Sequence, residues 1–191
     1  MEDTKQAIGM LDSGVGGLTV AREVMNTMKA EKIIYFGDTL HLPYGPKPKE
    51  DVRKYVYRII EYFKTRNVKT IILACNTATS MLLKETRRTV KLPLFGTIDG
   101  VAKSVKEATK NNKIGVIGTK GTIKSRAYQE ELKKESNNFE IHAKACPPFV
   151  NLAEEGHFKG AETKKVIHKY LDPLREKGID TLILGCTHYP Y

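Results

Sequence analysis

Two of the three cysteines stand in stretches of sequence that resemble each other. Residues 71–77 parallel residues 182–188, so that Cys75 and Cys186 each close an apolar run and each precede a polar pair. A free thiol has a pKa of about 8.5, close enough to neutrality for one partner to be ionised and the other protonated. Such a pair suits inversion at carbon, in which one thiolate removes an α-proton and the opposing thiol supplies a proton to the other face. We therefore predict that Cys75 and Cys186 are catalytic.

Each cysteine ends a predicted strand, and in an open α/β sheet ligands bind beyond the carboxyl ends of the strands. A helix is expected to start around Asn76 or Thr77, and a helix N-terminus lowers the pKa of a nearby thiol. Thr187 is the matching cap after Cys186, so the two sites are expected to be chemically equivalent. The competing interpretation is that each cysteine is a small buried hydrophobic residue. The repetition of the pattern in two places favours chemistry.

Removal of an α-proton from an amino acid requires donors that hold the developing negative charge. Backbone N–H groups and hydroxyls at Asn76-Thr77 and at Thr187-His188 are predicted to supply them. Simple capping is the alternative role for these residues, and the two roles are compatible.

A glycine-rich segment, residues 12–17, follows the first predicted strand. Its glycines allow the backbone to approach a ligand closely, and a phosphate loop is one interpretation. The full G-x-G-x-x-G spacing is missing, and Asp12 with Ser13 would place negative charge where a phosphate should sit. The segment therefore favours a carboxylate that binds an ammonium group.

Composition narrows the class of protein. The chain has 191 residues, 40% of them hydrophobic, which is ordinary for a globular protein and excludes disordered and collagen-like classes. The formal charge of +10 is spread over many segments that also contain acidic residues, as on solvated helix faces, so nucleic acid is not the favoured partner. Secretory and membrane-spanning segments are not expected, and the cytoplasm is the predicted location.

Metal and redox chemistry are not expected from the cysteines. Cys75, Cys146 and Cys186 are widely spaced and lack Cys-x-x-Cys or Cys/His pairs, so we expect free, reduced thiols, no metal site and no cofactor. Cys146 has no counterpart in the repeat and is expected to be structural.

Apolar runs that alternate with stretches of helical period predict an α/β fold with mostly parallel sheets. The expected strands are residues 7–11, 32–36, 70–74, 94–98, 113–117, 139–144 and 181–185, and the expected helices are residues 17–28, 49–65, 77–89, 101–109, 122–136 and 161–176. A second repeat relates residues 8–11 to residues 114–117 at a similar offset. We therefore predict two pseudo-symmetric, doubly wound domains, residues 1–98 and 99–191.

Several segments together resemble the glutamate racemases, within the aspartate/glutamate racemase superfamily. The matching segments are Asp12-Ser13-Gly14-Val15-Gly16-Gly17, Pro43-Tyr44-Gly45, Ala74-Cys75-Asn76-Thr77-Ala78 and Gly185-Cys186-Thr187-His188-Tyr189-Pro190. They occur in order and span nearly the whole chain.

The resemblance implies two α/β domains that close over glutamate without pyridoxal phosphate and yield D-glutamate for peptidoglycan. It implies that Cys75 and Cys186 are the acid/base residues. The substrate-binding residues it implies are Asp12, Ser13, Tyr44, Gly45, Asn76, Thr77, Thr187 and His188. Asp38, Glu154 and His188 are expected to tune the thiols, although Glu154 has the alternative role of a solvated helix residue. The expected partner is glutamate, with no membrane partner and with a homodimer left open.

The chain departs from the family pattern at its end. It stops at Tyr191, whereas the family continues with further strand and helix, so we expect the first domain to be incomplete.

Three alternative functions stay open. A racemase of aspartate or hydantoin would keep both thiols. A nucleotide-binding Rossmann module would explain the alternation of strands and helices and the glycines. The third alternative is an inactive, truncated binding protein.

Overall fold

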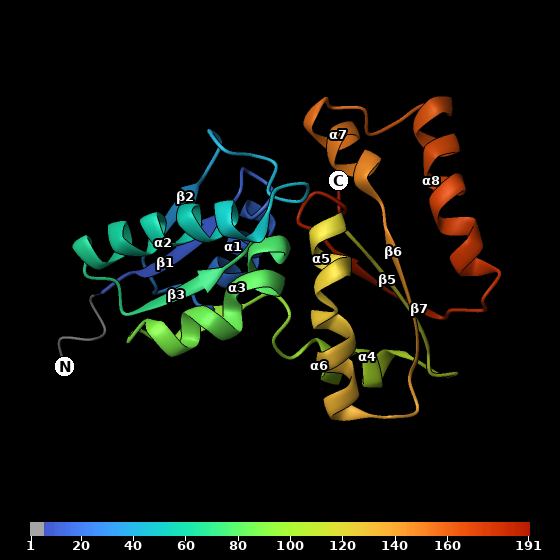
Figure 1. Ribbon diagram of the computed structural model, residues 1–191, viewed down its shortest axis with the longest axis horizontal. Coiled ribbons are helices and arrows are strands. Elements are labelled where there is room, and N and C mark those ends of the chain that lie inside the picture. The colour runs from blue at the N-terminus through green and yellow to red at the C-terminus, as the bar shows by residue number, and fades with distance from the viewer. Residues whose placement is uncertain (1–5) are drawn as a thin grey trace. The chain divides into compact units, whose positions relative to one another are not determined.

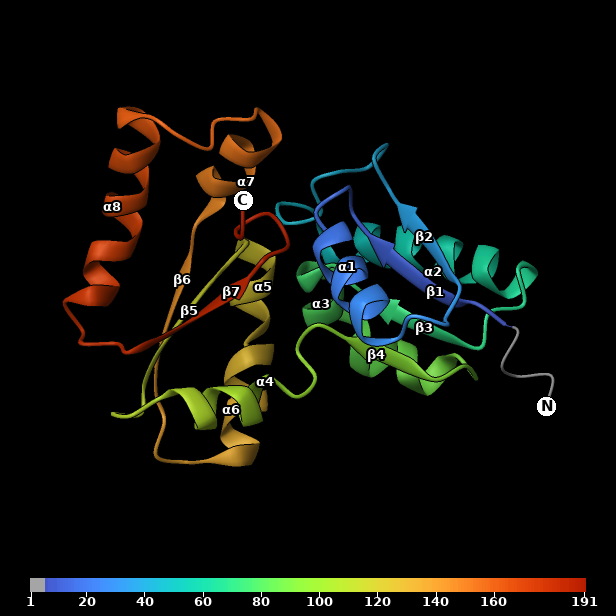
Figure 2. The same cartoon turned by 180° about the vertical axis from the view of Figure 1, so that it is seen from behind.

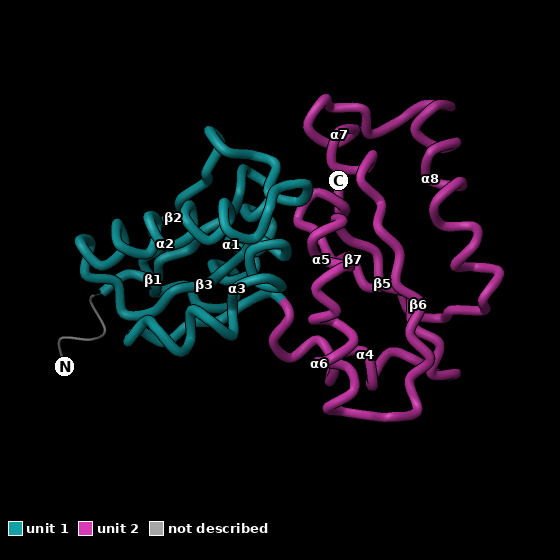
Figure 3. The backbone as a smooth tube through the Cα atoms, viewed as in Figure 1, with its two compact units in different colours: residues 1–97 teal, residues 98–191 magenta. Residues whose placement is uncertain are grey.

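The chain divides into two compact units in the computed structural model, which describes residues 6–191 (Figure 3). The boundary falls between Thr97 and Ile98. Ile98, the last residue of the expected first domain, packs with Ala102 and Val105 in the core of the second unit.

The first unit is a parallel sheet with helices on both faces (Figures 1 and 2). Its elements are β1 (Ile8–Asp12), α1 (Leu18–Thr27), β2 (Ile33–Gly37), α2 (Lys49–Thr65), β3 (Thr70–Leu73), α3 (Asn76–Thr89) and β4 (Leu94–Gly96). The strand order is β2-β1-β3-β4, so β1 and β3 are the central pair. Helix α1 covers one face of this sheet, and α2 with α3 cover the other.

Alternation of side chains along the central strands builds both layers of this unit. Leu11 and Leu73 belong to the cluster that α2 and α3 cover, whereas Met10 packs with Ala21 of α1. Because successive side chains of a strand point to opposite faces, a strand with both faces covered must be apolar throughout. All five residues of β1 are buried, and the four before Asp12 are apolar side chains or glycine.

The second unit repeats this plan with three strands. Its elements are α4 (Val101–Ala108), β5 (Lys113–Gly118), α5 (Lys120–Ser125), α6 (Ala127–Glu135), β6 (Glu140–Ala145), α7 (Pro147–Glu154), α8 (Ala161–Arg175) and β7 (Thr181–Gly185). The parallel order is β6-β5-β7, so β5 lies between the next two strands just as β1 lies between β2 and β3. The two sequence repeats therefore fall on topologically equivalent strands, β1 with β5 and β3 with β7.

Two helical predictions need correction. The single helix expected over residues 122–136 is two helices, α5 and α6, that meet at Arg126. Arg126 has a left-handed backbone with φ of 59°, which the α-helix does not accommodate. Helix α7 is absent from the predicted elements. Pro147 and Pro148 open it, and proline at the first helical positions was the signal for it.

Throughout the described part of the chain, every helix falls short of the length and apolar character that a membrane crossing requires.

A close contact between β1 and α2 generates a prediction about stability. A Cβ atom added at Gly9 would lie 2.9 Å from Cγ of Phe63, a fully buried side chain of α2. Gly9→Ala should therefore lower the free energy of unfolding by about 1–3 kcal/mol, the usual cost of overpacking a filled core. Urea unfolding followed by circular dichroism measures it.

The matched background is Phe63→Leu, whose smaller side chain leaves room at Gly9. In that background Gly9→Ala should cost clearly less, because the two residues are in contact and their effects are not additive. An equal cost in both backgrounds would show that the ring of Phe63 is not what excludes a side chain at Gly9.

Candidate functional site

The first unit brings Asp12, Ser13 and Cys75 together at the carboxyl ends of its two central strands. Asp12 ends β1, and Cys75 follows β3 after Ala74, whose N–H donates to the carbonyl of Leu11 at 2.8 Å. Cys75 Sγ lies 3.8 Å from Ser13 Oγ, within the longer range of sulfur hydrogen bonds. All three side chains are buried. The structure thus makes one cluster of residues that are distant in sequence.

The glycine-rich segment after β1 is held from two sides. Asp12 Oδ2 accepts a hydrogen bond from the N–H of Gly14 at 3.0 Å, and Tyr35 donates its hydroxyl to the Gly14 carbonyl at 2.8 Å. A Cβ at Gly37 would lie 2.5 Å from that same carbonyl oxygen, so β2 approaches the segment as closely as backbone atoms allow. This contact fixes the backbone next to Asp12.

Tyr44 and Asp38 form a second part of the site. The Tyr44 hydroxyl is buried and donates to Asp38 Oδ2 at 2.6 Å. Burial, together with this hydrogen bond, raises the pKa of Tyr44 far above its usual value, so the hydroxyl keeps its proton and acts as a donor. His41 contributes its ring nitrogen Nδ1 to both Asp38 oxygens, at 2.8 and 3.0 Å. Gly45 is buried beside Tyr44.

Helix α3 begins where the sequence predicts. Cys75 is its N-cap residue, Asn76 and Thr77 form its first turn, and the carbonyl of Cys75 accepts from the N–H of Thr79 at 2.9 Å. Asn76 and Thr77 are both buried. The sulfur of Cys75 therefore lies at the N-terminal end of a helix of fourteen residues.

The expectation of a lowered thiol pKa at Cys75 is wrong. Burial raises the pKa of Cys75 to about 12, and the negative charge of Asp12 acts in the same direction. The backbone N–H of Ala78, in the first turn of α3, lowers it as predicted, and the hydroxyl of Ser13 lowers it too, but both are outweighed. At neutral pH Cys75 is thus a thiol and not a thiolate.

In the second unit, Cys186 lies against His188, which in turn contacts Glu154. Cys186 Sγ is 3.5 Å from His188 Nδ1, and His188 Nε2 pairs with Glu154 Oε1. Cys186 and His188 are buried, whereas the Glu154 side chain is 31% exposed. Glu154 is thus more than a solvated helix residue, because α7 holds its carboxylate against the imidazole of His188.

The segment between Cys186 and the last described residue, Tyr191, forms a turn. The N–H of Tyr189 donates to the Cys186 carbonyl at 3.2 Å. Tyr189 also donates its hydroxyl to the Cys146 carbonyl at 2.9 Å, and its ring packs edge-on against Phe149. The contact of Cys186 with His188 distinguishes its surroundings from those of Cys75, and Thr187 is a buried turn residue.

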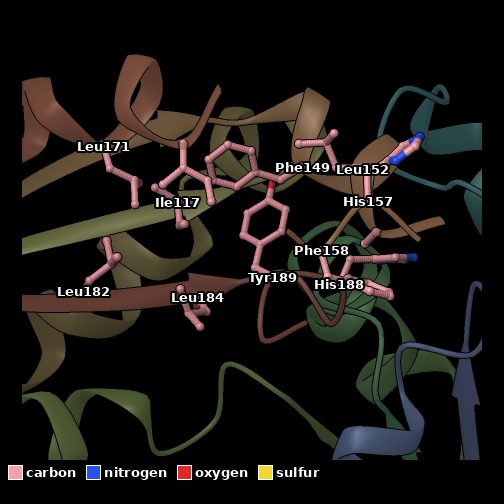
Figure 4. A pocket seen from close by; sticks show the side chains of 12 residues that line it. Ile117, Phe149, Leu152, His157, Phe158, Leu171, Leu182, Leu184, His188 and Tyr189 are labelled. Carbon is pink, nitrogen blue, oxygen red and sulfur yellow. The ribbon is translucent and has the colours of Figure 1, made fainter. Parts of the chain in front are cut away.

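An apolar pocket of about 160 Å³ adjoins His188 within the second unit (Figure 4). Its walls come from β7, α7 and α8, with Leu182, Leu184 and Phe149 among the lining side chains. Tyr189 is one of its lining residues, and its side chain lies centrally among those drawn in Figure 4. His188 thus has a polar side toward Cys186 and Glu154 and an apolar side toward this pocket.

Cys146 differs from the other two cysteines in its surroundings. It is fully buried at the start of α7, and burial raises its pKa to about 11. Its sulfur lies 3.7 Å from the carbonyl of Lys144, and its own carbonyl holds Tyr189. Among residues 6–191, no group of three or more His, Cys, Asp or Glu side chains is placed to hold a metal ion.

Three aromatic residues that support the site are not among the residues predicted from the sequence. Tyr35 donates a hydrogen bond to the Gly14 carbonyl, and the ring nitrogen Nδ1 of His41 pairs with Asp38. Tyr55 of α2 stacks on the His41 ring with centroids 3.9 Å apart. The spacing of His41, three residues after Asp38, was a usable signal. Tyr35 and Tyr55 gave no signal, since aromatic residues in a strand or helix normally fill a core.

The fold and the site consist of two parallel α/β units, each with a cysteine after one of two topologically equivalent strands. The family model described as "Asp/Glu/Hydantoin racemase" matches residues 8–191. The chain belongs to this family.

Individual relatives agree with this assignment. A glutamate racemase of Exiguobacterium sibiricum is 46% identical over 97% of this chain, which spans 68% of that protein. Among solved structures, a glutamate racemase isoform from Bacillus anthracis has a TM-score of 0.94 at 40% identity and is matched over 98% of this chain and 70% of its own. The glutamate racemase of Francisella tularensis, in complex with D-glutamate, has a TM-score of 0.90 at 36% identity over the same shares.

The electrostatics of Cys75 generate a prediction. Asp12→Asn removes a negative charge but keeps an oxygen that can accept from Gly14, so the pKa of Cys75 should fall below 12 yet stay above that of a free thiol, because burial remains the larger cause. The pH dependence of iodoacetamide labelling, quantified by mass spectrometry on the peptide that contains Cys75, measures it.

Glu61→Gln is the control. Glu61 is an exposed carboxylate on α2 that pairs with Lys64, and solvent screens its charge. It should leave the labelling profile of Cys75 unchanged. A profile that does not move in Asp12→Asn would contradict the role assigned to Asp12.

Proposed function

We propose that this chain interconverts L-glutamate and D-glutamate by proton transfer between two thiols, without a cofactor. The observation that carries the proposal is the placement of Cys75 and Cys186, each at the carboxyl end of a strand, on strands that are topologically equivalent. Membership of the racemase family and relatives named glutamate racemase at 46–47% identity support the choice of reaction and substrate.

In the proposed reaction, one cysteine as thiolate takes the α-proton of glutamate and becomes a thiol. The other cysteine, as a thiol, gives its proton to the opposite face of the same carbon and becomes a thiolate. Charge and protons balance, and the reverse reaction exchanges the two roles. Cys75 and Cys186 are the catalytic residues of this proposal, and both must reach a single bound substrate.

The surroundings of Cys75 imply that the substrate itself assists the loss of the thiol proton. Asp12 raises the pKa of Cys75, and a glutamate ammonium group bound at Asp12 would offset that negative charge. The N–H of Gly14 already orients the Asp12 carboxylate. Asp12 and Ser13 are therefore proposed to bind the ammonium side of glutamate, next to the sulfur that reacts.

Beside Cys186, a histidine and a carboxylate take the role that Asp12 and the substrate ammonium have beside Cys75. His188 Nδ1 is within reach of Cys186 Sγ, and Glu154 fixes the ring through Nε2. A histidine so oriented can hold or exchange the proton of the thiol. We assign His188 and Glu154 to the tuning of Cys186.

The carboxylates of glutamate need fixed donors. Helix α3 begins with Asn76 and Thr77, and its first-turn N–H groups point toward the end at which Cys75 lies. We propose that Asn76, Thr77 and Thr187, with the Tyr44-Gly45 segment, bind the substrate carboxylates.

We also propose a cellular location, a role for the product and an assembly. Three free, buried cysteines are consistent with a reducing compartment and hence with the cytoplasm. D-glutamate made there would supply peptidoglycan synthesis, and a homodimer is the proposed assembly. Aspartate and hydantoin are the competing substrates, and the names of the relatives favour glutamate over them.

The experiment that tests the proposal is incubation of L-glutamate with the chain in deuterated water. We expect α-deuteration and loss of optical rotation together in the parent chain, and no racemisation in Cys75→Ser or Cys186→Ser, because a serine hydroxyl is not a comparable base near neutral pH. Mass spectrometry and polarimetry follow the two signals. Full activity in either serine variant would exclude the two-thiol mechanism.

Cys146→Ser is the matched control, since Cys146 is also buried but is assigned to packing. It should keep turnover within about twofold of the parent. Substrates are compared in the same assay. Exchange with aspartate or hydantoin but not glutamate would correct the substrate, and no exchange with any of them would favour a binding role.

Cofactor independence gives a separate prediction. Because the proposal assigns both proton transfers to side chains of the chain itself, dialysis against EDTA and omission of pyridoxal phosphate should leave turnover unchanged. Turnover before and after dialysis measures this. Loss of turnover that a single added metal restores would contradict the proposed mechanism.

A further inference from the structure

His41 is linked to the candidate site by more than one contact. Its Nδ1 lies 2.8 and 3.0 Å from the two oxygens of Asp38, and its backbone N–H donates to the Asp38 carbonyl at 3.1 Å. Asp38 in turn accepts the hydroxyl of Tyr44 at 2.6 Å. One carboxylate therefore joins a half-buried imidazole to a fully buried phenol.

Tyr55 closes this group from the side of α2. Its ring stacks on His41 at 3.9 Å between centroids with an interplanar angle of 16°, and it lies 5.9 Å from the ring of Tyr44. The imidazole is therefore held in two ways, by a polar bond at its edge and by a stack on its face. These two contacts can be removed separately by mutation.

Tyr44 lies in the same part of the first unit as the reactive cysteine. Tyr44 and Cys75 belong to one buried cluster, and the charges of Cys75 and Asp12 act on the Tyr44 hydroxyl. Anything that moves Tyr44 thus moves a group beside the proposed thiol and its ammonium-binding carboxylate.

We propose that His41 is a positioning residue for substrate binding, which holds the Asp38 carboxylate so that Tyr44 and Gly45 keep their place beside Cys75. This role rests on the proposed function, since Tyr44 and Gly45 are assigned there to the substrate carboxylates. His41 itself touches neither substrate nor thiol. Its Nδ1 lies within hydrogen-bond distance of both oxygens of Asp38, and one of these, Oδ2, also accepts from Tyr44.

Two variants separate the bond from the stack. His41→Phe keeps an aromatic ring for Tyr55 and loses the donor to Asp38, whereas His41→Asn loses the ring and keeps an amide N–H close to the position of Nδ1. The proposal expects His41→Phe to raise the KM for glutamate about tenfold with kcat within about twofold, as for a lost charge-assisted hydrogen bond. His41→Asn should keep KM within about threefold of the parent.

A merely structural role for His41 gives a different pattern. The stack on Tyr55 would then matter most, so His41→Asn would lower the melting temperature and impair turnover more than His41→Phe does. That result, or an unchanged KM in His41→Phe, would overturn the proposal. His168→Phe is the matched control, because it breaks the same kind of His–Asp pair, with Asp172, on the exposed surface of α8. It should leave KM and kcat unchanged.

Binding of D-glutamate, measured by isothermal titration calorimetry, separates failure of this proposal from failure of the racemase assignment. If the parent chain binds glutamate but does not turn it over, the proposed function fails, and His41 is judged by whether His41→Phe weakens binding about tenfold while His41→Asn does not. If the parent neither binds nor turns over glutamate, both proposals fall.

Discussion

The burial of two acidic groups side by side is the constraint on which the first unit depends. Asp12 is fully buried, and Cys75 is nearly so, at the ends of neighbouring strands. Neither charge is solvated by bulk water, and the two negative charges would repel each other. The site therefore accommodates the Asp12 carboxylate with a neutral thiol beside it. A thiolate at Cys75 needs a nearby positive charge, which an α-amino acid carries on its ammonium group.

The magnitudes show why the helix does not decide the state of Cys75. The pKa of about 12 at this thiol is reached although the Ala78 N–H and the Ser13 hydroxyl lower it, so burial and the charge of Asp12 together exceed them. A helix N-terminus contributes about 0.3–2 kcal/mol in favour of a negative charge. Burial therefore outweighs the dipole of α3, although the Ala78 N–H acts in the expected direction. The same burial excludes water from the proposed proton transfer.

The sequence allowed the fold to be predicted better than the site, for a physical reason. Strands and helices follow from local periodicity, and helix α2 has the bounds that its pattern predicts. Arg126 was missed because a left-handed residue that breaks a helix leaves little trace in an amphipathic pattern. The repeated cysteines could be found by comparing the chain with itself. The contacts of His41 with Tyr55 and of His188 with Glu154 join separate segments, and no local pattern encodes them.

The two cysteines have different surroundings, and thermodynamics limits what that difference can do. In the proposed mechanism Cys75 depends on Asp12 and the substrate ammonium, while Cys186 has His188 and Glu154 beside it. L- and D-glutamate have equal free energies in water and share one transition state, so kcat/KM must be equal for the two directions. The unequal surroundings can therefore alter kcat and KM only together. A higher kcat for one enantiomer therefore comes with a proportionally higher KM for that enantiomer.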